Sequence, residues 1–243
     1  MAVVSLLRSV VFNIFYVLWT IGVGSLGIPT LFVPGRRSFA VPHLWCRGLV
    51  WGARILLGIR WRVEGLENLP QGACILASKH QSAWETLFLP MLVPKPVFVL
   101  KKELLSIPFV GWHMAKTGMI AVDRKAGASA MKTMLRGADA AFAEGRQMII
   151  FPEGTRVPVG ENPPFQPGIA ALYARFGDHV PLVPVALNSG LVWGRNSFVK
   201  SPGEVVVRIF PAIEPGLDKK VFTERLQAVI NGESARLCGN GDS

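Results

Sequence analysis

Acidic residues are scarce in this 243-residue chain, and tyrosine and cysteine are rarer still. Asp and Glu number 16 against 26 Lys and Arg, so the formal net charge is +10 at pH 7. A strongly basic balance favours anionic partners, either nucleic acid or acidic lipid. No nucleic-acid module signature is present, while 50% of the residues are hydrophobic and the mean hydropathy is +0.37. The composition therefore indicates association with lipid and argues against nucleic acid.

Motifs typical of several other chemistries are also missing. The three cysteines, Cys46, Cys74 and Cys238, are scattered and lack the spacing of metal ligands, so we expect reduced thiols. The sequence contains neither a glycine-x-serine-x-glycine elbow nor a phosphate-loop lysine motif. We expect no metal site and no resident cofactor.

The first 63 residues lack lysine, aspartate and glutamate, although they contain seven arginines. Between Arg8 and Arg36 lie 27 consecutive residues without a charged side chain, rich in Val, Ile, Leu, Phe and Trp. A bilayer-spanning helix needs ~20 apolar residues, so this segment is long enough. The glycines between Gly22 and Gly27, followed by Pro29, interrupt it. A kinked, re-entrant or half-immersed helix is therefore the alternative to a full span.

A second apolar segment, residues 39–59, carries Arg47 and Arg54 and is typical of an interfacial helix whose arginines reach toward water. Together the two segments predict a membrane-anchoring helical hairpin over residues 1–58. The arginine excess after the first segment places the rest of the chain on the cytoplasmic side, which is the inner membrane if the source is bacterial. A cleaved signal peptide is disfavoured, because no small-x-small cleavage site follows promptly.

From residue 59 onward, strand-like and helix-like patterns alternate. Predicted strands cover residues 61–64, 74–77, 97–100, 119–122, 147–151, 182–187 and 205–210, and predicted helices cover 82–91, 129–144, 169–176 and 221–237. Such alternation predicts an α/β fold, a mostly parallel sheet flanked by helices. We expect one catalytic domain over 59–238 and a disordered tail over 239–243.

His80 and Glu85 form the first candidate for chemistry. Five residues on a helix leave two side chains ~140° apart, so these two meet only if His80 precedes a helix that begins near Ser82. Glu85 would then be the third helical residue and could cap its own helix, a structural role that can coexist with a chemical one. The chemical reading is a dyad. Glu85 accepts the Nδ1 proton of His80, and Nε2 acts as general base toward a substrate hydroxyl.

A second motif, Phe151-Pro152-Glu153-Gly154-Thr155-Arg156, follows the apolar run 148–150 and is expected at the end of a strand. Gly154 permits close backbone approach, Thr155 offers a hydroxyl, and Arg156 offers a planar fork for phosphate oxygens. Glu153 suits an anion site only if it binds a glycerol hydroxyl or positions an arginine. Arg124, after the strand-like run 119–122, could reach the same phosphate; a solvated surface charge is an equally good reading.

Taken together, these segments resemble the glycerolipid acyltransferase family, which includes the 1-acylglycerol-3-phosphate acyltransferases. Four motifs of that family occur in order, at residues 79–85, 118–124, 151–156 and 180–185. The family's first motif is Asn-His, four residues, then Asp; here Lys79-His80 and Glu85 occupy those places, and Glu is one methylene longer. The third motif, Phe-Pro-Glu-Gly-Thr-Arg, is matched letter for letter.

The resemblance implies transfer of a fatty acyl group from acyl-CoA or acyl carrier protein to the sn-2 hydroxyl of lysophosphatidic acid. The product is phosphatidic acid, in phospholipid biosynthesis at the membrane. His80 and Glu85 would be catalytic. The substrate-binding residues would be Arg124, Glu153, Gly154, Thr155 and Arg156. Two alternatives remain open: another acceptor, such as a lyso-aminolipid, or a non-catalytic lipid-binding membrane protein.

Overall fold

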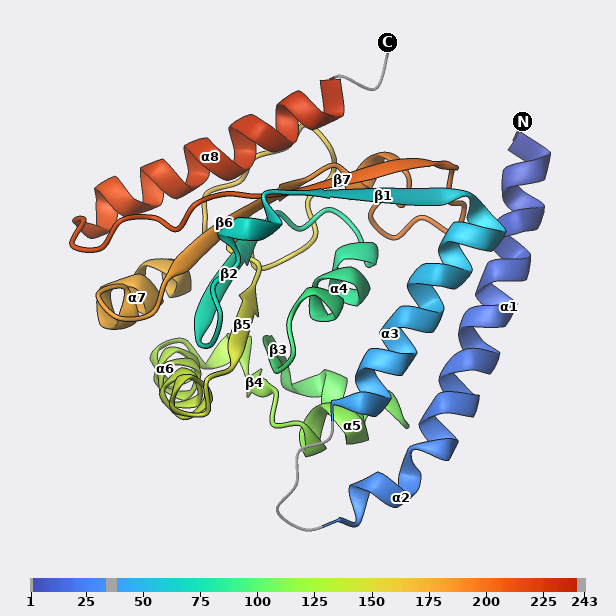
Figure 1. Ribbon diagram of the computed structural model, residues 1–243, viewed down its shortest axis with the longest axis horizontal. Helices are drawn as coiled ribbons and strands as arrows, with labels where there is room; N and C mark the ends of the chain where they lie inside the picture. The colour runs from blue at the N-terminus through green and yellow to red at the C-terminus, as the bar shows by residue number, and fades with distance from the viewer. Residues whose placement is uncertain (1, 34–38, 240–243) are drawn as a thin grey trace.

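The computed structural model describes residues 2–33 and 39–239. Its centre is a seven-stranded sheet in the order β1-β7-β6-β2-β5-β3-β4, with helices against both faces (Figure 1). Neighbouring strands run parallel, except that β6 and β7 are antiparallel. The strands are β1 Ile59–Glu64, β2 Cys74–Ser78, β3 Pro96–Lys101, β4 Ile120–Val122, β5 Gln147–Ile150, β6 Leu182–Leu187 and β7 Gly203–Ile209. The predicted α/β fold with a mostly parallel sheet is confirmed, and every predicted strand segment forms a strand.

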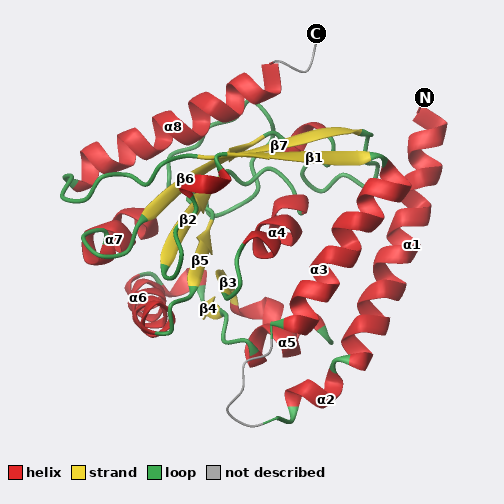
Figure 2. Ribbon diagram, in the orientation of Figure 1, coloured by secondary structure: helices red, strands yellow, loops and turns green. Residues whose placement is uncertain are grey.

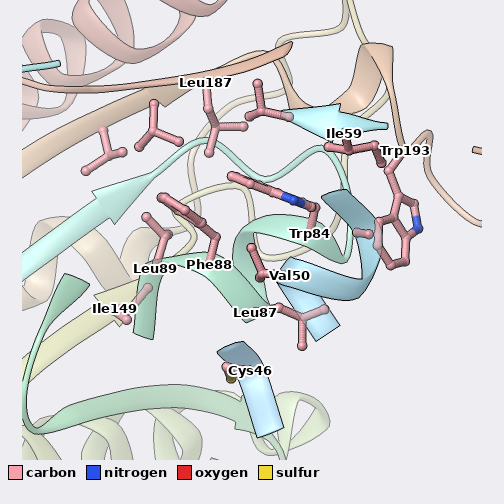
Figure 3. Packing of buried hydrophobic residues seen from close by; sticks show 14 of the residues in the cluster. Cys46, Val50, Ile59, Trp84, Leu87, Phe88, Leu89, Ile149, Leu187 and Trp193 are labelled. Atoms are coloured by element: carbon pink, nitrogen blue, oxygen red, sulfur yellow. The ribbon is translucent and has the colours of Figure 1, made fainter. Parts of the chain in front are cut away.

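The central strands are buried on both faces, as expected of parallel strands covered by helices (Figure 2). Side chains of β2 alternate between two layers. Ile75 and Ala77 pack with residues of α6, α7 and α8, whereas Leu76 packs with residues of α3 and α4. Figure 3 shows the second layer, where Trp84 and Phe88 of α4 lie near Val50 of α3. The two apolar layers hold the sheet between them.

The α-helices of the described residues form two groups, an N-terminal hairpin and the helices that cover the sheet. They are α1 Ala2–Leu26, α2 Ile28–Leu31, α3 Ala40–Gly52, α4 Trp84–Phe88, α5 Val110–Lys116, α6 Ala128–Ala143, α7 Pro167–Phe176 and α8 Lys219–Gly239. The predictions for α6, α7 and α8 are confirmed. The helix predicted over 82–91 is observed only as α4, Trp84–Phe88. It ends there because Pro90 lies in a 3-10 turn, Leu89–Leu92, that follows α4. Helix α5 was not predicted, since its seven residues are too few to show a helical period.

At the N-terminus, α1 and α3 lie side by side as a hairpin (Figure 1). Helix α1 continues through Gly22 and Gly24 and ends at Leu26, and Gly27 then precedes the separate short helix α2, which contains Pro29. The predicted interruption is therefore present at Gly27 but not at the two earlier glycines. The predicted second helix extends too far: Gly58 has a φ of 74°, which ends the helical path, and Ile59 already belongs to β1. Arg36 and residues 240–243 of the predicted tail lie outside the described residues, and Gly239 ends α8.

One helix of the described residues, Val3–Leu26, is long and apolar enough to cross a membrane by length and composition. This helix also packs against the domain, at the loop between β6 and β7. The Phe12 ring meets Trp193 edge to face at 5.4 Å between centroids, and Ser9 Oγ accepts the backbone N–H of Lys200 at 2.9 Å. The division between residues 1–58 and 59–238 stays a prediction, since the hairpin shares the core of the domain.

Candidate active site

Three segments far apart in sequence end at the same edge of the sheet. His80 follows the end of β2, Phe151 follows β5, and Asp123 follows β4. Carboxyl ends of parallel strands meet at one edge, the usual place for sites in open α/β sheets. The rings of His80 and Phe151 stack there, with centroids 3.9 Å apart and planes 17° from parallel. The first and third sequence motifs therefore share one site.

The predicted dyad geometry is present. His80 Nδ1 lies 2.9 Å from Glu85 Oε1, at hydrogen-bond distance. Ser82 forms the turn between them: its N–H donates to Glu85 Oε1 at 2.7 Å, and its Oγ accepts the N–H of Trp84 at 2.9 Å. Glu85 thus caps the turn and contacts His80 at once, so the two arrangements coexist, while the catalytic role of the pair stays a prediction. Helix α4 begins at Trp84, slightly later than predicted.

Glu85 is fully buried, yet it accepts several hydrogen bonds. Oε1 also accepts the N–H of Gln81 at 2.7 Å, and Oε2 accepts the hydroxyls of Ser82 and Ser189, each at 2.7 Å. Burial acts to raise the pKa of Glu85, but the hydrogen bond and charge of His80, with the bonds from Ser189 and Ser82, hold that pKa below its usual value. The carboxylate is therefore ionised and fixed in orientation near neutral pH.

The backbone of His80 is also held on both sides. Its N–H donates to Glu153 Oε2 at 2.8 Å, and its carbonyl oxygen accepts the N–H of Val157 at 2.7 Å. The imidazole retains 13% of its exposure. With Nδ1 directed to Glu85, Nε2 is the nitrogen available to a substrate, and no hydrogen bond within the described residues occupies it. A histidine fixed in this way can accept a proton at one defined atom.

A cavity of about 590 Å³ opens beside His80. Its walls come from β3, β4, β5, α6, α7 and the loop after β5. The side chains that give it apolar character are Val99, Val122, Ala130, Met131, Met134, Ile150, Phe151 and Ile169. Gly154 and Thr155 of the third motif, residues 151–156, also line this cavity, as His80 does. An apolar space with one basic nitrogen at its edge suits a fatty acyl chain that carries a reactive group at its end.

The loop after β5 places the remaining motif residues. Gly154 has a φ of 71°, and a Cβ there would lie 2.8 Å from Gln166 Cγ, so the turn requires glycine. Thr155 is exposed, whereas Arg156 is partly buried. The backbone of Arg124 follows β4 as expected, and its side chain lies outside what the structure describes.

Sequence reasoning missed two functional candidates. Ser189 reaches Glu85 from a 3-10 turn after β6, and nothing in the local sequence indicates that contact. Lys79 is buried and lies 2.7 Å from Glu153, which is itself buried. Its burial depends on partners from the loop after β5 and from α8, which the local sequence does not show. Among the described residues, no group of three or more His, Cys, Asp or Glu could hold a metal ion.

Comparison with known proteins agrees with this geometry. The profile of the Acyltransferase family matches residues 60–188. Over 216 residues, the chain is 39% identical to the 1-acyl-sn-glycerol-3-phosphate acyltransferase of Pseudomonas aeruginosa, covering 88% of this chain and 83% of that protein. The chain belongs to the acyltransferase family.

Two further similarities extend the comparison. Over 203 residues, the chain is 30% identical to the 1-acyl-sn-glycerol-3-phosphate acyltransferase alpha of Mus musculus, covering 82% of this chain and 70% of that protein. The crystal structure of the 1-acyl-sn-glycerophosphate (LPA) acyltransferase PlsC from Thermotoga maritima matches with a TM-score of 0.76 at 21% identity. That match covers 96% of this chain and 97% of the other, and it establishes a shared fold.

Proposed function

We propose that this acyltransferase transfers a fatty acyl group to the free sn-2 hydroxyl of 1-acyl-glycerol-3-phosphate, forming phosphatidic acid for phospholipid biosynthesis. The donor is an acyl thioester, either acyl-CoA or acyl carrier protein. The hydrogen bond between His80 and Glu85 beside an apolar cavity carries the chemical part of the proposal. The names of the related proteins from Pseudomonas aeruginosa and Mus musculus support the acceptor.

The reaction needs a base but no nucleophile from the protein. His80 Nε2 takes the proton of the acceptor hydroxyl while that oxygen attacks the thioester carbonyl. Glu85, ionised and directed at Nδ1, stabilises the imidazolium that forms. The carbon–sulfur bond then breaks, and the thiolate leaves with the proton from His80. The acyl chain occupies the apolar cavity, with its carbonyl carbon next to the histidine.

The phosphate of the acceptor needs cations near this edge of the sheet. A phosphate monoester carries nearly two negative charges and presents several acceptor oxygens. Arg156, partly buried in the loop after β5, and Arg124, two residues after the end of β4, are the proposed clamp. Thr155 offers a hydroxyl at the cavity wall for the glycerol part. The charge of the acceptor then decides which lysolipid binds.

The hairpin would hold the enzyme at its substrate. Leu7, Ile14 and Leu18 of α1 are among its exposed apolar side chains, a surface that suits a bilayer. The arginine excess after the first apolar segment favours the cytoplasmic face for the catalytic domain. The lysolipid can then enter from the membrane while a soluble thioester arrives from water.

Product analysis with a panel of acceptors tests the proposal. Purified protein in mixed micelles is given labelled acyl-CoA or labelled acyl carrier protein, together with lysophosphatidate, a neutral lysolipid or a lyso-aminolipid. We expect labelled phosphatidic acid from lysophosphatidate and little product from the others, and we expect His80→Ala to lower its rate of formation by ~10²–10⁴. Acylation of the lyso-aminolipid alone would replace the acceptor, and no product from any acceptor would overturn the activity.

A further inference from the structure

We infer that Lys79 is a positioning residue whose buried ion pair with Glu153 holds the His80 backbone in its catalytic geometry, so that Glu153 acts inside the protein and not on substrate. The kinetic test of this inference, by kcat and KM, rests on the proposed acyl transfer. The structural test, by hydrogen–deuterium exchange, does not depend on it.

Glu153 is directed at two consecutive residues of the first motif. Its Oε1 lies 2.7 Å from Lys79 Nζ, and its Oε2 accepts the N–H of His80 at 2.8 Å. The Glu153 side chain retains 0% of its exposure and that of Lys79 retains 2%. Glu153 contributes to the cavity wall, but with a fully buried side chain that contribution comes from its backbone. A single carboxylate thus joins the side chain of Lys79 to the main chain of His80.

Lys79 makes three further contacts. Its Nζ lies 3.2 Å from the carbonyl oxygen of Glu161, 3.0 Å from Asn162 Oδ1 and 3.0 Å from Asn231 Oδ1. These partners belong to the loop after β5 and to α8. An ammonium group has three hydrogens, and four oxygens lie within 3.2 Å of this one when Glu153 Oε1 is counted, so each hydrogen has an acceptor and the charge has a carboxylate beside it. Lys79 therefore ties the end of β2, the motif loop and the C-terminal helix to one point directly before His80.

The charge balance of this pair gives it a testable signature. Burial raises the pKa of Glu153, although the charge and hydrogen bond of Lys79 and the N–H of His80 act to lower it. Without Lys79 the carboxylate would be buried with one less compensating charge, so its pKa would rise further. Breaking a buried pair from one side is costly, whereas replacing both partners with neutral groups is often tolerated. Loss of both charges should therefore lower kcat less than loss of the lysine alone.

The experiment compares four variants in the full-length protein. Lys79→Met removes the charge and keeps the length of the side chain. Lys79→Arg keeps the charge, and Lys79→Met with Glu153→Gln removes both charges. Lys200→Met is the matched control: Lys200 is also buried, but it contacts Asn13 and Phe198 and no carboxylate of the described residues. Each variant is measured for kcat and KM over a range of pH, and for hydrogen–deuterium exchange in peptides 78–82 and 151–166.

We expect Lys79→Met to lower kcat by about 10²-fold through misplacement of His80, with the KM for lysolipid little changed. The acid limb of its kcat profile should move to higher pH, and exchange in both peptides should increase. Lys79→Arg should recover part of the loss. The double variant should be more active than Lys79→Met and should lose the shift of the acid limb, while Lys200→Met should resemble the wild type.

Two results would overturn the inference. One is wild-type kcat, pH profile and exchange in Lys79→Met. The other is a double variant that is less active than Lys79→Met and has a raised KM for lysolipid, which would mean that Glu153 contacts the acceptor. If Lys79→Met does not fold, Lys79→Arg and the double variant still decide between these outcomes. If the wild type does not acylate lysophosphatidate, the proposed function fails, while the exchange data still test the role of Lys79.

Discussion

Ser189 donates its hydroxyl hydrogen bond to Oε2 of Glu85 at 2.7 Å, across 104 residues of sequence. The hydroxyl of Ser82 reaches the same oxygen, so Oε1 remains directed at His80 and the backbone turn. Both serines are fully buried. The orientation of the histidine therefore depends on the turn after β6 as well as on the local motif.

Ser189→Ala should lower kcat about tenfold, because it removes a hydrogen bond to a buried charge worth ~1.5–3 kcal/mol. The pKa of Glu85 should rise, since the Ser189 bond is one of the interactions that lower it. Steady-state kinetics at several pH values checks this. Ser197→Ala, at an exposed serine in the loop before β7, is the control. Equal kcat in the two variants would show that Ser189 does not support the dyad.

His80→Ala should cost ~10²–10⁴ in turnover if the imidazole is the general base, without a comparable loss of lysolipid binding. Glu85→Gln should cost less, and Glu85→Asp little, because a carboxylate remains. The measurement is kcat and KM for each variant beside His179→Ala, whose histidine is exposed. Near-normal turnover in His80→Ala would contradict the mechanism.

Arg156→Ala and Arg124→Ala should each raise the KM for lysophosphatidate by about one to two orders of magnitude, which corresponds to ~1.5–3 kcal/mol. Arg→Lys should rescue only partly, since an ammonium lacks the bidentate fork. The KM for the thioester donor should change much less. Arg195→Ala, at an exposed arginine, is the control. Unchanged kinetics in both variants, or equal use of a neutral lysolipid, would remove these arginines from the phosphate clamp.

Stability should fall in acid partly through Glu85. Its pKa in the folded protein is below the ordinary value of 4.5, so the unfolded state binds more protons than the folded state in that window. The stabilisation from this group is complete well above pH 4.5 and is lost as the pH falls through the lower, folded-state pKa. Denaturant unfolding of Glu85→Gln at a series of pH values should show a shallower acid slope than the wild type. Identical slopes would mean that Glu85 contributes nothing to acid sensitivity.

Membrane attachment should resist high salt, because it is mainly hydrophobic. Ile14→Asp with Leu18→Asp, on the exposed side of α1, should shift the protein from the membrane pellet to the supernatant, since each charge costs ~2.5–3.5 kcal/mol in a bilayer core. The control, Val221→Asp at an exposed apolar residue of α8, should leave the protein in the membrane pellet. Sedimentation measures both. Complete release of the wild type by high salt would mean that the arginines hold the protein at the membrane electrostatically and that the attachment is not mainly hydrophobic. Deleting residues 1–58 is a poorer test, because Phe12, Leu49 and Val50 belong to the core.

Much of the fold could be predicted from local pattern alone. The runs that became β2, β5 and β6 are apolar because these strands are buried on both faces, and that requirement is visible within each segment. The spacing of His80 and Glu85 likewise predicts their contact, because a turn before a helix has few possible geometries. Helix α5 was missed for the opposite reason, since seven residues supply too little pattern.

Contacts across long sequence separations were decided only by the tertiary structure. Ser189 binds Glu85 because β6 lies next to β2 in the sheet, and Lys79 meets Glu153 because β5 lies on the other side of β2. Strand order depends on how whole layers pack, which no single segment encodes. Lys79 lies in a polar motif and would be taken as solvated from the sequence alone. The structure buries it, because the loop after β5 and helix α8 pack around the end of β2 and bring Glu153 to its ammonium group. The sequence by itself determined the strands, most of the helices and the histidine–glutamate pair, while the packing of distant strands decided what holds that pair in place.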